Sequence, residues 1–373
     1  MPKAPTNSWH FARPQLAAQH LQALDLGLIS ATALHARRRM GKTEFLIQDL
    51  TPAAEQHGYA VGYCNLWQED LDPSQAISDA LLACAKPKRM LPKIRSKLGK
   101  PVSSVKVSGK VGGLAEGGAE LGFKSSDRAV SGKLANAWAT FDRSRNRGLL
   151  LIDEAQVLTD RRYHSLERAL RAGLDTRKDR LKVLFTGSSE DRLRSMFGRE
   201  HKPFYNWARV EPLPLLGEDF VRELTRRANS LTTLKLALRD SEAAFVSLNR
   251  VPELFRRFLA QYLANPFDGA EIAIVRCKQS VYLEEGFASR WEALLPADQL
   301  VLLWVAQGKY DLHSVQSLAR LGRALKLARA ADRSVPQNAL KRLRDRQVLI
   351  QSEIGVYRFE DEAFKEWILS ERG

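Results

Sequence analysis

Between Leu28 and about Leu216, short apolar runs alternate with stretches in which apolar residues recur every three or four positions. The runs predict buried strands, and the recurring pattern predicts amphipathic helices. The predicted strands are Ile29–Ala36, Tyr59–Trp67, Gly148–Asp153, Lys182–Ser188 and Ala208–Leu213; the predicted helices are Lys42–Gln56, Ser74–Cys84, Gly132–Phe141 and Tyr163–Leu174. Strands that alternate with helices need crossover connections. The pattern therefore predicts an α/β fold, a mostly parallel sheet with helices on both faces.

Residues 86–131 interrupt this alternation. They carry a run of basic side chains with no acidic residue before Glu116: Lys86, Lys88, Arg89, Lys93, Arg95, Lys97, Lys100, Lys106 and Lys110. The segment Val102–Phe123 is rich in glycine and partly alternating, which predicts a β-hairpin that projects from the sheet. Two interpretations stay open: a basic arm that contacts nucleic acid or a neighbouring subunit, or a solvated insertion.

The pattern after Leu216 is helical. Helices predicted at Glu218–Ser230, Ser241–Leu248 and Pro252–Leu263 form a small all-α lid. Further on, the predicted order is three helices, a two-stranded hairpin and a closing helix: Asp298–Ala306, His313–Ala330, Gln337–Arg346, Val348–Ser352, Gly355–Phe359, and a last helix that holds Phe364, Trp367 and Ile368. That order is typical of a winged helix-turn-helix. We therefore expect three domains, at residues 1–216, 217–290 and 291–373.

Charge changes the picture more than composition does. The 373 residues include 58 Lys and Arg against 43 Asp and Glu, a net charge of +15. Such an excess favours polyanionic partners, with DNA first among them, although basic character also serves solubility alone. No apolar run approaches the roughly 18 residues of a membrane span, the N-terminus lacks the apolar core of a signal peptide, and the three cysteines have no ligand spacing. We expect a cytoplasmic protein that does not enter a membrane, and self-assembly stays open.

The segment Ala36–Thr43 reads A-R-R-R-M-G-K-T, between a predicted strand and a predicted helix. That context is the one a phosphate-binding loop requires, because its backbone N–H groups and the helix N-terminus face the phosphates. Lys42 is the candidate for the β- and γ-phosphates, and the Thr43 hydroxyl is the candidate Mg²⁺ ligand. Ala36 stands where the motif G-x-x-x-x-G-K-[ST] has its first glycine, so the loop requires a negative φ there. The candidate nucleotide-binding residues of this segment are Arg39, Met40, Gly41, Lys42, Thr43 and Glu44.

A buried-strand run, Leu149–Ile152, ends in two carboxylates. Carboxylates at the end of a parallel strand lie where such sheets bind ligands. Asp153 is the candidate for the Mg²⁺ shell, and Glu154 is the candidate general base for the attacking water. Together with the first motif, this pair predicts an ATP and Mg²⁺ site.

The strand run ending at Gly187-Ser188-Ser189 supplies a third candidate. In a sheet with the other two motifs, Ser188 would lie beside Asp153 as a polar sensor of the γ-phosphate. An ordinary Gly-Ser turn is the alternative.

The four segments "RRRMGKT", "LLLIDEAQ", "LFTGSS" and "PFYNWARVEPLPL" occur in an order that resembles the archaeal-type ATPases of the AAA+/STAND group of P-loop NTPases. The resemblance covers about residues 10–265, and more loosely a C-terminal winged helix like that of Orc/Cdc6-like initiators. It implies a base-proximal role for Arg13, in the Phe11-Ala12-Arg13 start. It also implies a γ-phosphate role for Arg209, with Arg199 nearby, acting within the chain or on a neighbouring subunit.

The same resemblance implies a nucleotide-sensor role for Arg250. It lies in Leu248-Asn249-Arg250-Val251-Pro252, where Asn249 replaces the family's usual glycine. An ordinary surface arginine is the alternative for this position.

Basic residues gather again between positions 311 and 350: Arg320, Arg323, Lys326, Arg329, Arg333, Lys341, Arg342, Arg344 and Arg346. The helix Gln337–Arg346 precedes the hairpin, which is the position of a recognition helix. The candidate nucleic-acid contacts are Asn338, Lys341, Arg342 and Arg344 there, and Lys88, Arg89, Lys93, Arg95 and Lys97 in the basic insertion. A winged helix that binds protein is the alternative.

The sequence thus predicts an ATP-binding and ATP-hydrolysing AAA+-like switch that acts on DNA. A transposition regulator of a mobile element and an initiator-like loader both fit that description. A STAND-like signalling ATPase with a protein-binding winged helix is the alternative, and a nucleotide-binding protein without meaningful turnover is a third.

Overall fold

The computed structural model describes residues 9–67, 72–86, 132–353 and 355–373. The chain forms two compact units. One consists of Ala12–His35 and Thr43–Pro212 and contains the large sheet; we call it the sheet unit. The other consists of the residues up to Phe11, the loop Ala36–Lys42 and Leu213–Gly373; we call it the helical unit. The predicted hairpin at Val102–Phe123 lies outside the described residues.

The sheet unit is built on five parallel strands in the order β2-β3-β4-β1-β5. They are β1 (Ala31–His35), β2 (Tyr59–Asn65), β3 (Arg147–Asp153), β4 (Leu181–Gly187) and β5 (Arg209–Pro212). Every described pairing is parallel, and β4 lies between β1 and β3. The predicted α/β class with a mostly parallel sheet is confirmed. All three candidate motifs therefore follow strands that end at one edge of the sheet.

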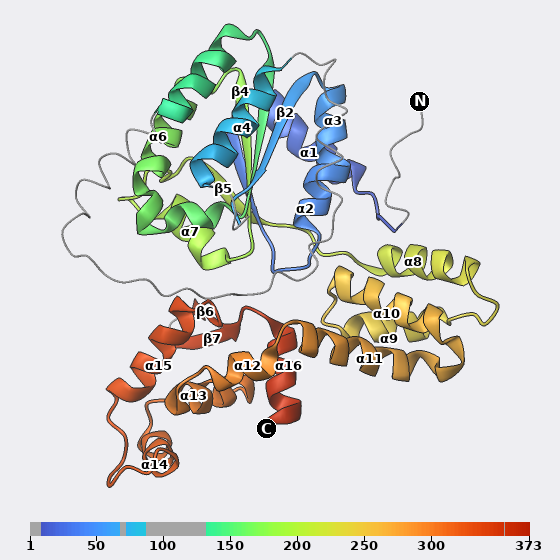
Figure 1. The fold of residues 1–373 in the computed structure, drawn as a ribbon, viewed down its shortest axis with the longest axis vertical. Coiled ribbons are helices and arrows are strands. Elements are labelled where there is room, and N and C mark those ends of the chain that lie inside the picture. Colours follow the sequence, from blue (N-terminus) through green and yellow to red (C-terminus); the bar gives the residue numbers. More distant parts are fainter. Residues whose placement is uncertain (1–8, 68–71, 87–131, 354) are drawn as a thin grey trace, which may run out of the picture. The chain divides into compact units, whose positions relative to one another are not determined.

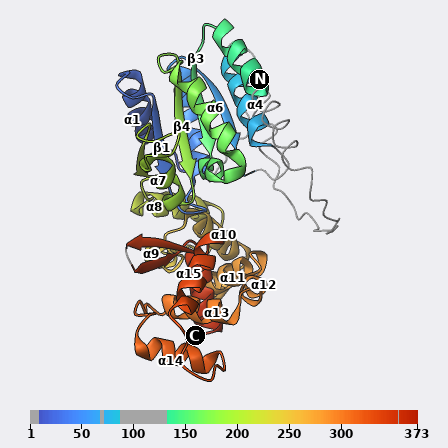
Figure 2. The same ribbon diagram turned by 90° about the vertical axis from the view of Figure 1, so that its left-hand side faces the viewer.

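Helices cover both faces of this sheet (Figures 1 and 2). On one face lie α1 (Pro14–Asp25) and the helical run α2 (Lys42–Glu44), η1 (Phe45–Leu50) and α3 (Thr51–Gln56). On the other face lie α4 (Pro73–Ala85), a helix at residues 132–143, and α6 (His164–Asp175). The sheet unit is completed by the short turns η3 (Ala155–Thr159) and η4 (Arg161–Tyr163) and by α7 (Glu190–Gly198).

Strands β3 and β4 are buried on both faces, as a covered parallel sheet requires. Leu150 and Ile152 point into the cluster formed with α4 and α6, and the alternate residues Leu149 and Leu151 are also fully buried. This is why the sequence shows continuous apolar runs here and not an alternating pattern. The core thereby fixes the ends of β3 and β4, where the polar motifs begin.

Helix α4 lies against β2 at closest approach over Gly62. A Cβ atom built there would lie 1.9 Å from the carbonyl oxygen of Ala80. Only glycine fits at this contact, since a real Cβ cannot approach backbone so closely.

The helical unit begins with α8 (Glu218–Ser230), α9 (Leu238–Ser247), α10 (Pro252–Ala264) and α11 (Gly269–Glu284). A short turn η5 (Pro266–Asp268) precedes α11, and α12 (Phe287–Glu292) follows it. The remaining elements are α13 (Pro296–Ala306), α14 (Val315–Ala324), α15 (Ser334–Asp345), β6 (Leu349–Glu353), β7 (Val356–Phe359) and α16 (Glu362–Glu371). One apolar cluster runs through these elements from Phe220 to Ile368.

Strands β6 and β7 pair in an antiparallel hairpin after three helices. This is the element order that a winged helix has, and the assignment of a separate winged-helix domain stays a prediction, as do the domain bounds. Among the described residues, no helix is both long and apolar enough to cross a membrane.

One predicted helix is wrong in extent. The pattern predicted His313–Ala330, whereas α14 ends at Ala324. Lys326 takes a left-handed conformation with φ 56°, and the N–H of Leu327 turns back to the carbonyl of Gly322. The backbone of residues 329–331 then crosses α14 at Gly322, where a Cβ would lie 2.5 Å from the Arg329 carbonyl oxygen. The sequence shows no glycine or proline at the helix end, so periodicity alone extended the helix.

We predict that Gly62→Val destabilises the sheet unit by about 1–3 kcal/mol, because α4 must move away from β2 to admit the side chain. Thermal unfolding followed by circular dichroism should show a lower midpoint, by roughly 2–4 °C per kcal/mol. Gly198→Ala is the matched control, because a Cβ there meets no atom within 4 Å. An unchanged midpoint for Gly62→Val would contradict the close approach.

Candidate functional site

The loop between β1 and α2 contains two residues in the left-handed backbone region. Arg39 and Gly41 have φ values of 65° and 81°, whereas Ala36 is not among the described residues with positive φ. Alanine therefore fits at the position where the motif has its first glycine. Met40 is buried in the loop. The negative φ that the loop requires at Ala36 is therefore present.

The Lys42 ammonium group lies inside this loop and is bound to its backbone. It donates to the carbonyl oxygens of Ala36, at 2.8 Å, and Arg37, at 3.2 Å. The side chain is only 5% exposed. Backbone carbonyls thus hold the buried charge at the centre of the loop, where a phosphate group would meet it.

Thr43 and Asp153, 110 residues apart in the chain, meet at the carboxyl ends of the strands. The Thr43 hydroxyl donates to Asp153 Oδ2 at 2.5 Å. Asp153 is completely buried and also accepts hydrogen bonds from the Thr186 hydroxyl and, at 3.2 Å, from the Tyr63 hydroxyl. Burial, with a further contribution from Asp153, raises the pKa of Tyr63, which therefore remains a donor.

Glu154 lies directly after this strand, in a left-handed conformation with φ 56°. One of its oxygens, Oε2, accepts from the Ser188 hydroxyl at 2.7 Å, from the Ser188 N–H at 3.1 Å and from Gln156 Nε2 at 2.5 Å. The carboxylate is therefore held by the end of β4. Ser188, the predicted sensor, contacts Glu154 and not Asp153 in this structure.

Arg13 lies against the helix that follows Thr43. Its backbone N–H donates to Asp49 Oδ1 at 3.0 Å, and its guanidinium lies 4.9 Å from the centre of the Phe45 ring. Burial lowers the pKa of Arg13, and Asp49 opposes that shift. Asp49 and Phe45 belong to η1, a π-helical stretch, and such stretches are frequent at functional sites.

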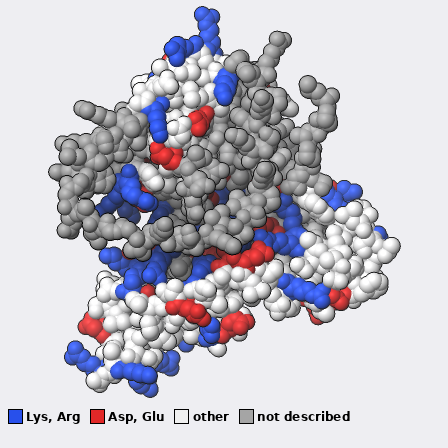
Figure 3. Space-filling model, viewed as in Figure 1, with Lys and Arg blue, Asp and Glu red and all other residues white. Residues whose placement is uncertain are grey.

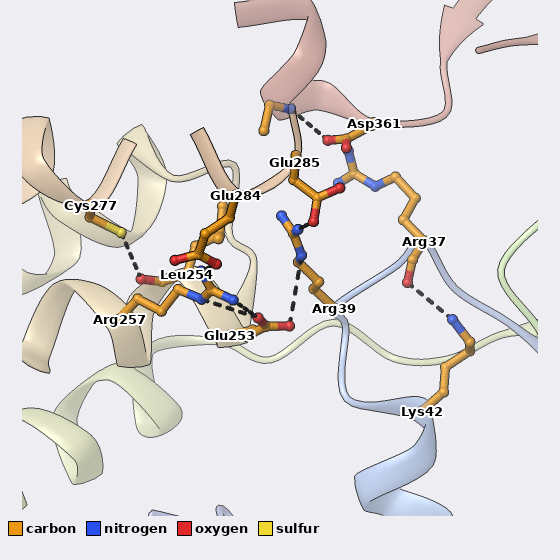
Figure 4. Close-up of polar contacts among 11 residues, drawn as sticks. Arg37, Arg39, Lys42, Glu253, Leu254, Arg257, Cys277, Glu284, Glu285 and Asp361 are labelled. Atoms are coloured by element: carbon orange, nitrogen blue, oxygen red, sulfur yellow. Dashed lines mark hydrogen bonds and ion pairs between the residues drawn. The ribbon is translucent and has the colours of Figure 1, made fainter. Parts of the chain in front are cut away.

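Within the helical unit, the loop arginines contact acidic side chains (Figure 4). Arg39 pairs with Glu285 and, at 3.8 Å, with Glu253. Arg37 lies 3.8 Å from Glu362, at the start of α16. These contacts were not expected from the sequence, which gave no reason to connect the loop with α10, α11 or α16.

Three further predicted arginines lie on the surface. Arg250 is exposed and follows Asn249; both have positive φ, 53° and 56°, so Asn249 adopts the conformation that glycine would take. Arg209, on the edge strand β5, has a side chain that is 87% exposed and lies 3.4 Å from Glu211. Arg199 is exposed after α7.

The candidate nucleic-acid residues of α15 divide into two kinds. Arg342 forms a bidentate contact with Asp298 of α13, which is completely buried, and Arg344 donates to Gln351 at 3.0 Å. Asn338 and Lys341 are exposed. The candidates Lys88, Arg89, Lys93, Arg95 and Lys97 lie outside the described residues.

The donor set around Asp153 fits Mg²⁺, which prefers oxygen ligands and is usually held by one or two carboxylates together with nucleotide phosphates. Thr43 Oγ1 and the Asp153 carboxylate are oxygen donors within hydrogen-bond distance of each other. The described residues contain no group of three His, Cys, Asp or Glu side chains that could hold a metal on its own. A magnesium ion at this place would take its remaining ligands from water and nucleotide phosphates.

Sequence reasoning did not single out Thr186 and Tyr63, whose hydroxyl groups donate to Asp153. Both lie near the carboxyl ends of strands that neighbour β3, and β4 was already assigned a polar end. The strand order, which the sequence does not reveal, is what brings them to Asp153. Gln156 carried a signal, because it belongs to the segment "LLLIDEAQ", two positions after Glu154, on which the family resemblance rests.

Comparison with known proteins gives a fold relationship. No protein-family model matches the chain, and no curated protein sequence matches it. Among solved structures, it is similar to the Walker-type ATPase PABY2304 of Pyrococcus abyssi, with 18% identity, 95% of each chain covered and a TM-score of 0.59. It is also similar to the ORC2 protein of Aeropyrum pernix in its ADPNP–ADP complexes, with 15% identity, 95% of this chain and 92% of that chain covered, and a TM-score of 0.53.

The resemblance read from the motifs is confirmed at the level of the fold. Both similarities extend over nearly the whole chain, so they include the helical unit as well as the sheet. The chain therefore has the fold of the archaeal Walker-type and Orc-type P-loop ATPases.

Proposed function

We propose that the chain is a Mg²⁺-dependent ATPase that works as a nucleotide-controlled switch on DNA. The observation that carries the nucleotide part is the 2.5 Å hydrogen bond between Thr43 and Asp153. Two motifs that are far apart in sequence thereby offer a hydroxyl and a carboxylate to one magnesium ion. Lys42 precedes Thr43 in the chain and supplies the positive charge for the β- and γ-phosphates.

Glu154 is the proposed general base. It is a carboxylate one residue beyond the Asp153 ligand, and a base there would take a proton from the water that attacks the γ-phosphate. In the present structure Ser188 and Gln156 occupy one of its oxygens. Hydrolysis therefore requires the other oxygen or a rotation of the side chain, so Ser188 and Gln156 position the base.

The DNA part rests on the distribution of unpaired basic side chains. Arg320 and Arg323 on α14, and Lys326, Arg329 and Arg333 in the turn after it, are exposed and form no ion pair within the described part of the chain. Figure 3 shows Lys and Arg side chains gathered at the end of the helical unit where Figure 1 labels α14. The backbone of residues 329–331 packs against Gly322, so the turn that carries Arg329 lies beside α14.

This surface, with Lys341 and Asn338 of α15, is the proposed contact for the phosphate backbone. The arginines that sequence pattern favoured, Arg342 and Arg344, are engaged in contacts within the unit. The exposed groups keep their full charge for a polyanion.

We predict that Glu154→Gln keeps nucleotide binding but lowers phosphate release by about 100-fold or more, because the glutamine cannot accept the proton. Lys42→Ala is expected to weaken binding of a fluorescent ATP analogue itself, since the phosphates lose their main charge partner. Phosphate release and equilibrium binding are measured in parallel for both variants. Equal phosphate release by Glu154→Gln and the unaltered protein would show that Glu154 is not the base.

For DNA, we predict an affinity for duplex that falls steeply with salt. The double substitution Arg323→Glu with Arg329→Glu is expected to weaken binding to every sequence alike and to lower the slope of log K against log[salt] by about 2, one per lost phosphate contact. Fluorescence anisotropy with a labelled duplex measures both quantities, with ATP, with ADP and without nucleotide.

Arg239→Glu on α9 is the control for the same kind of charge change, because that side chain is 94% exposed and lies on another helix. If no duplex binding occurs even at low salt, the DNA part of the proposal is wrong. The helical unit would then be examined as a surface for a protein partner.

A further inference from the structure

Arg39 occupies a backbone conformation that suits glycine better than arginine. Its φ is 65°, a value that residues other than glycine adopt rarely because Cβ meets the following carbonyl group. It lies three residues before Lys42, inside the loop that surrounds the lysine ammonium. Strain of this kind persists only where the surroundings enforce it.

Two carboxylates supply that enforcement. The Arg39 guanidinium pairs with Glu285 and with Glu253, and its side chain is only 17% exposed. Partly buried pairs are screened less by water than surface pairs are. The ion pairs of the Arg39 side chain therefore hold this residue in place, and the loop backbone takes the conformation that they impose.

The carboxylates are themselves fixed. Glu253 lies in the first turn of α10, where Arg257 donates to Glu253 Oε1 at 2.8 Å. That helix begins after the two left-handed residues Asn249 and Arg250, which set the direction of the chain. Glu285 directly follows the last residue of α11. Figure 4 shows both carboxylates pointing toward the Arg39 side chain.

The surroundings contain further charges that keep this arrangement balanced. Arg290 lies 3.9 Å from Asp361 and stacks over the Phe364 ring at 4.5 Å. Burial lowers the pKa of Arg290; Asp361 and Glu285 oppose the shift, and Arg38 and Arg39 add to it. Glu285 thus pairs with the Arg39 guanidinium and also acts electrostatically on Arg290.

We propose that Glu253 and Glu285 are positioning residues for nucleotide binding: they hold Arg39 in its left-handed conformation and thereby keep the loop open for phosphate. This inference rests on the proposed ATP site and adds to it the source of the loop's shape. Neither carboxylate touches the nucleotide. Their effect passes through the backbone of residues 39–41.

The alternative effect of these carboxylates has the opposite sign. If they only neutralised Arg39, their removal would leave an extra positive charge near the phosphates and would tighten nucleotide binding. If they position the loop, their removal lets Arg39 relax toward negative φ, and binding weakens. The direction of the change therefore separates the two.

The test is a double-mutant cycle on the full-length chain. The double substitution Glu253→Gln with Glu285→Gln is expected to weaken binding of a fluorescent, non-hydrolysable ATP analogue with Mg²⁺ by about tenfold, since the left-handed conformation loses its support. Arg39→Gly alone is expected to bind within about threefold of the unaltered protein, because glycine adopts this φ freely. With Arg39→Gly present, the two glutamine substitutions should have almost no further effect.

Glu284→Gln is the matched control. It removes the neighbouring carboxylate at the end of α11, which contacts Arg257 and not Arg39. Its binding is expected to equal that of the unaltered protein. Circular dichroism melting accompanies each variant, because a merely structural loss would lower stability in both Arg39 backgrounds and would weaken binding equally in both.

The inference is overturned if the double glutamine variant binds as tightly as the unaltered protein or more tightly, or if the effect is the same with Arg39→Gly present. These outcomes leave the proposed ATP site intact when Lys42→Ala weakens binding as expected. If the unaltered protein itself binds no nucleotide, the proposed ATP site and this inference both fall.

Discussion

The sheet unit depends on one buried charge. Asp153 is completely buried at the end of β3, where an unpaired carboxylate would cost several kcal/mol. Three hydroxyl groups offset that cost by donating hydrogen bonds to the carboxylate, those of Thr43, Tyr63 and Thr186. They come from the helix after β1, from β2 and from β4, so the carboxylate can be satisfied only when these elements are in their native register. The fold and the candidate site therefore depend on the same contacts, because the hydroxyl groups that stabilise the buried Asp153 are those that surround the proposed Mg²⁺ position.

The sequence was informative wherever one period dominated. The apolar run Leu149–Ile152 predicted β3 and its position before two carboxylates, and G-K-T predicted the start of α2. Strand order was beyond reach, since the placement of β4 between β1 and β3 follows from tertiary packing. For the same reason the sequence shows Thr186 only as a polar residue near a strand end. Its contact with Asp153 follows from the position of β4 beside β3. Helix α1 and helices α7, α11 and α12 were not predicted from the sequence.

The sequence does not distinguish arginines that form internal ion pairs from arginines that are exposed. Arg342 and Arg323 both occur in a basic, helical stretch, and pattern favoured Arg342 because it precedes the hairpin. In the structure Arg342 neutralises Asp298, which is completely buried, while Arg323 is exposed. Without its arginine, Asp298 would be a buried carboxylate with no ionic partner, so Arg342 is committed to the core of the helical unit. The net charge of +15 does not show which basic side chains are exposed; among the described residues, those of α14 and of the turn after it are exposed and form no ion pair.

The phosphate-binding loop shows the same division of labour between local sequence and distant contacts. In a loop rich in glycine, the backbone reaches left-handed conformations without help. Here Gly41 does so freely, whereas Arg39 is the residue that the proposal supports from outside. Its long charged side chain connects the shape of the loop to the groups that bind the guanidinium. In this chain those partners are Glu253 and Glu285. Under this proposal, nucleotide binding is coupled to the position of α10 and α11, and the coupling free energy is the same in both directions.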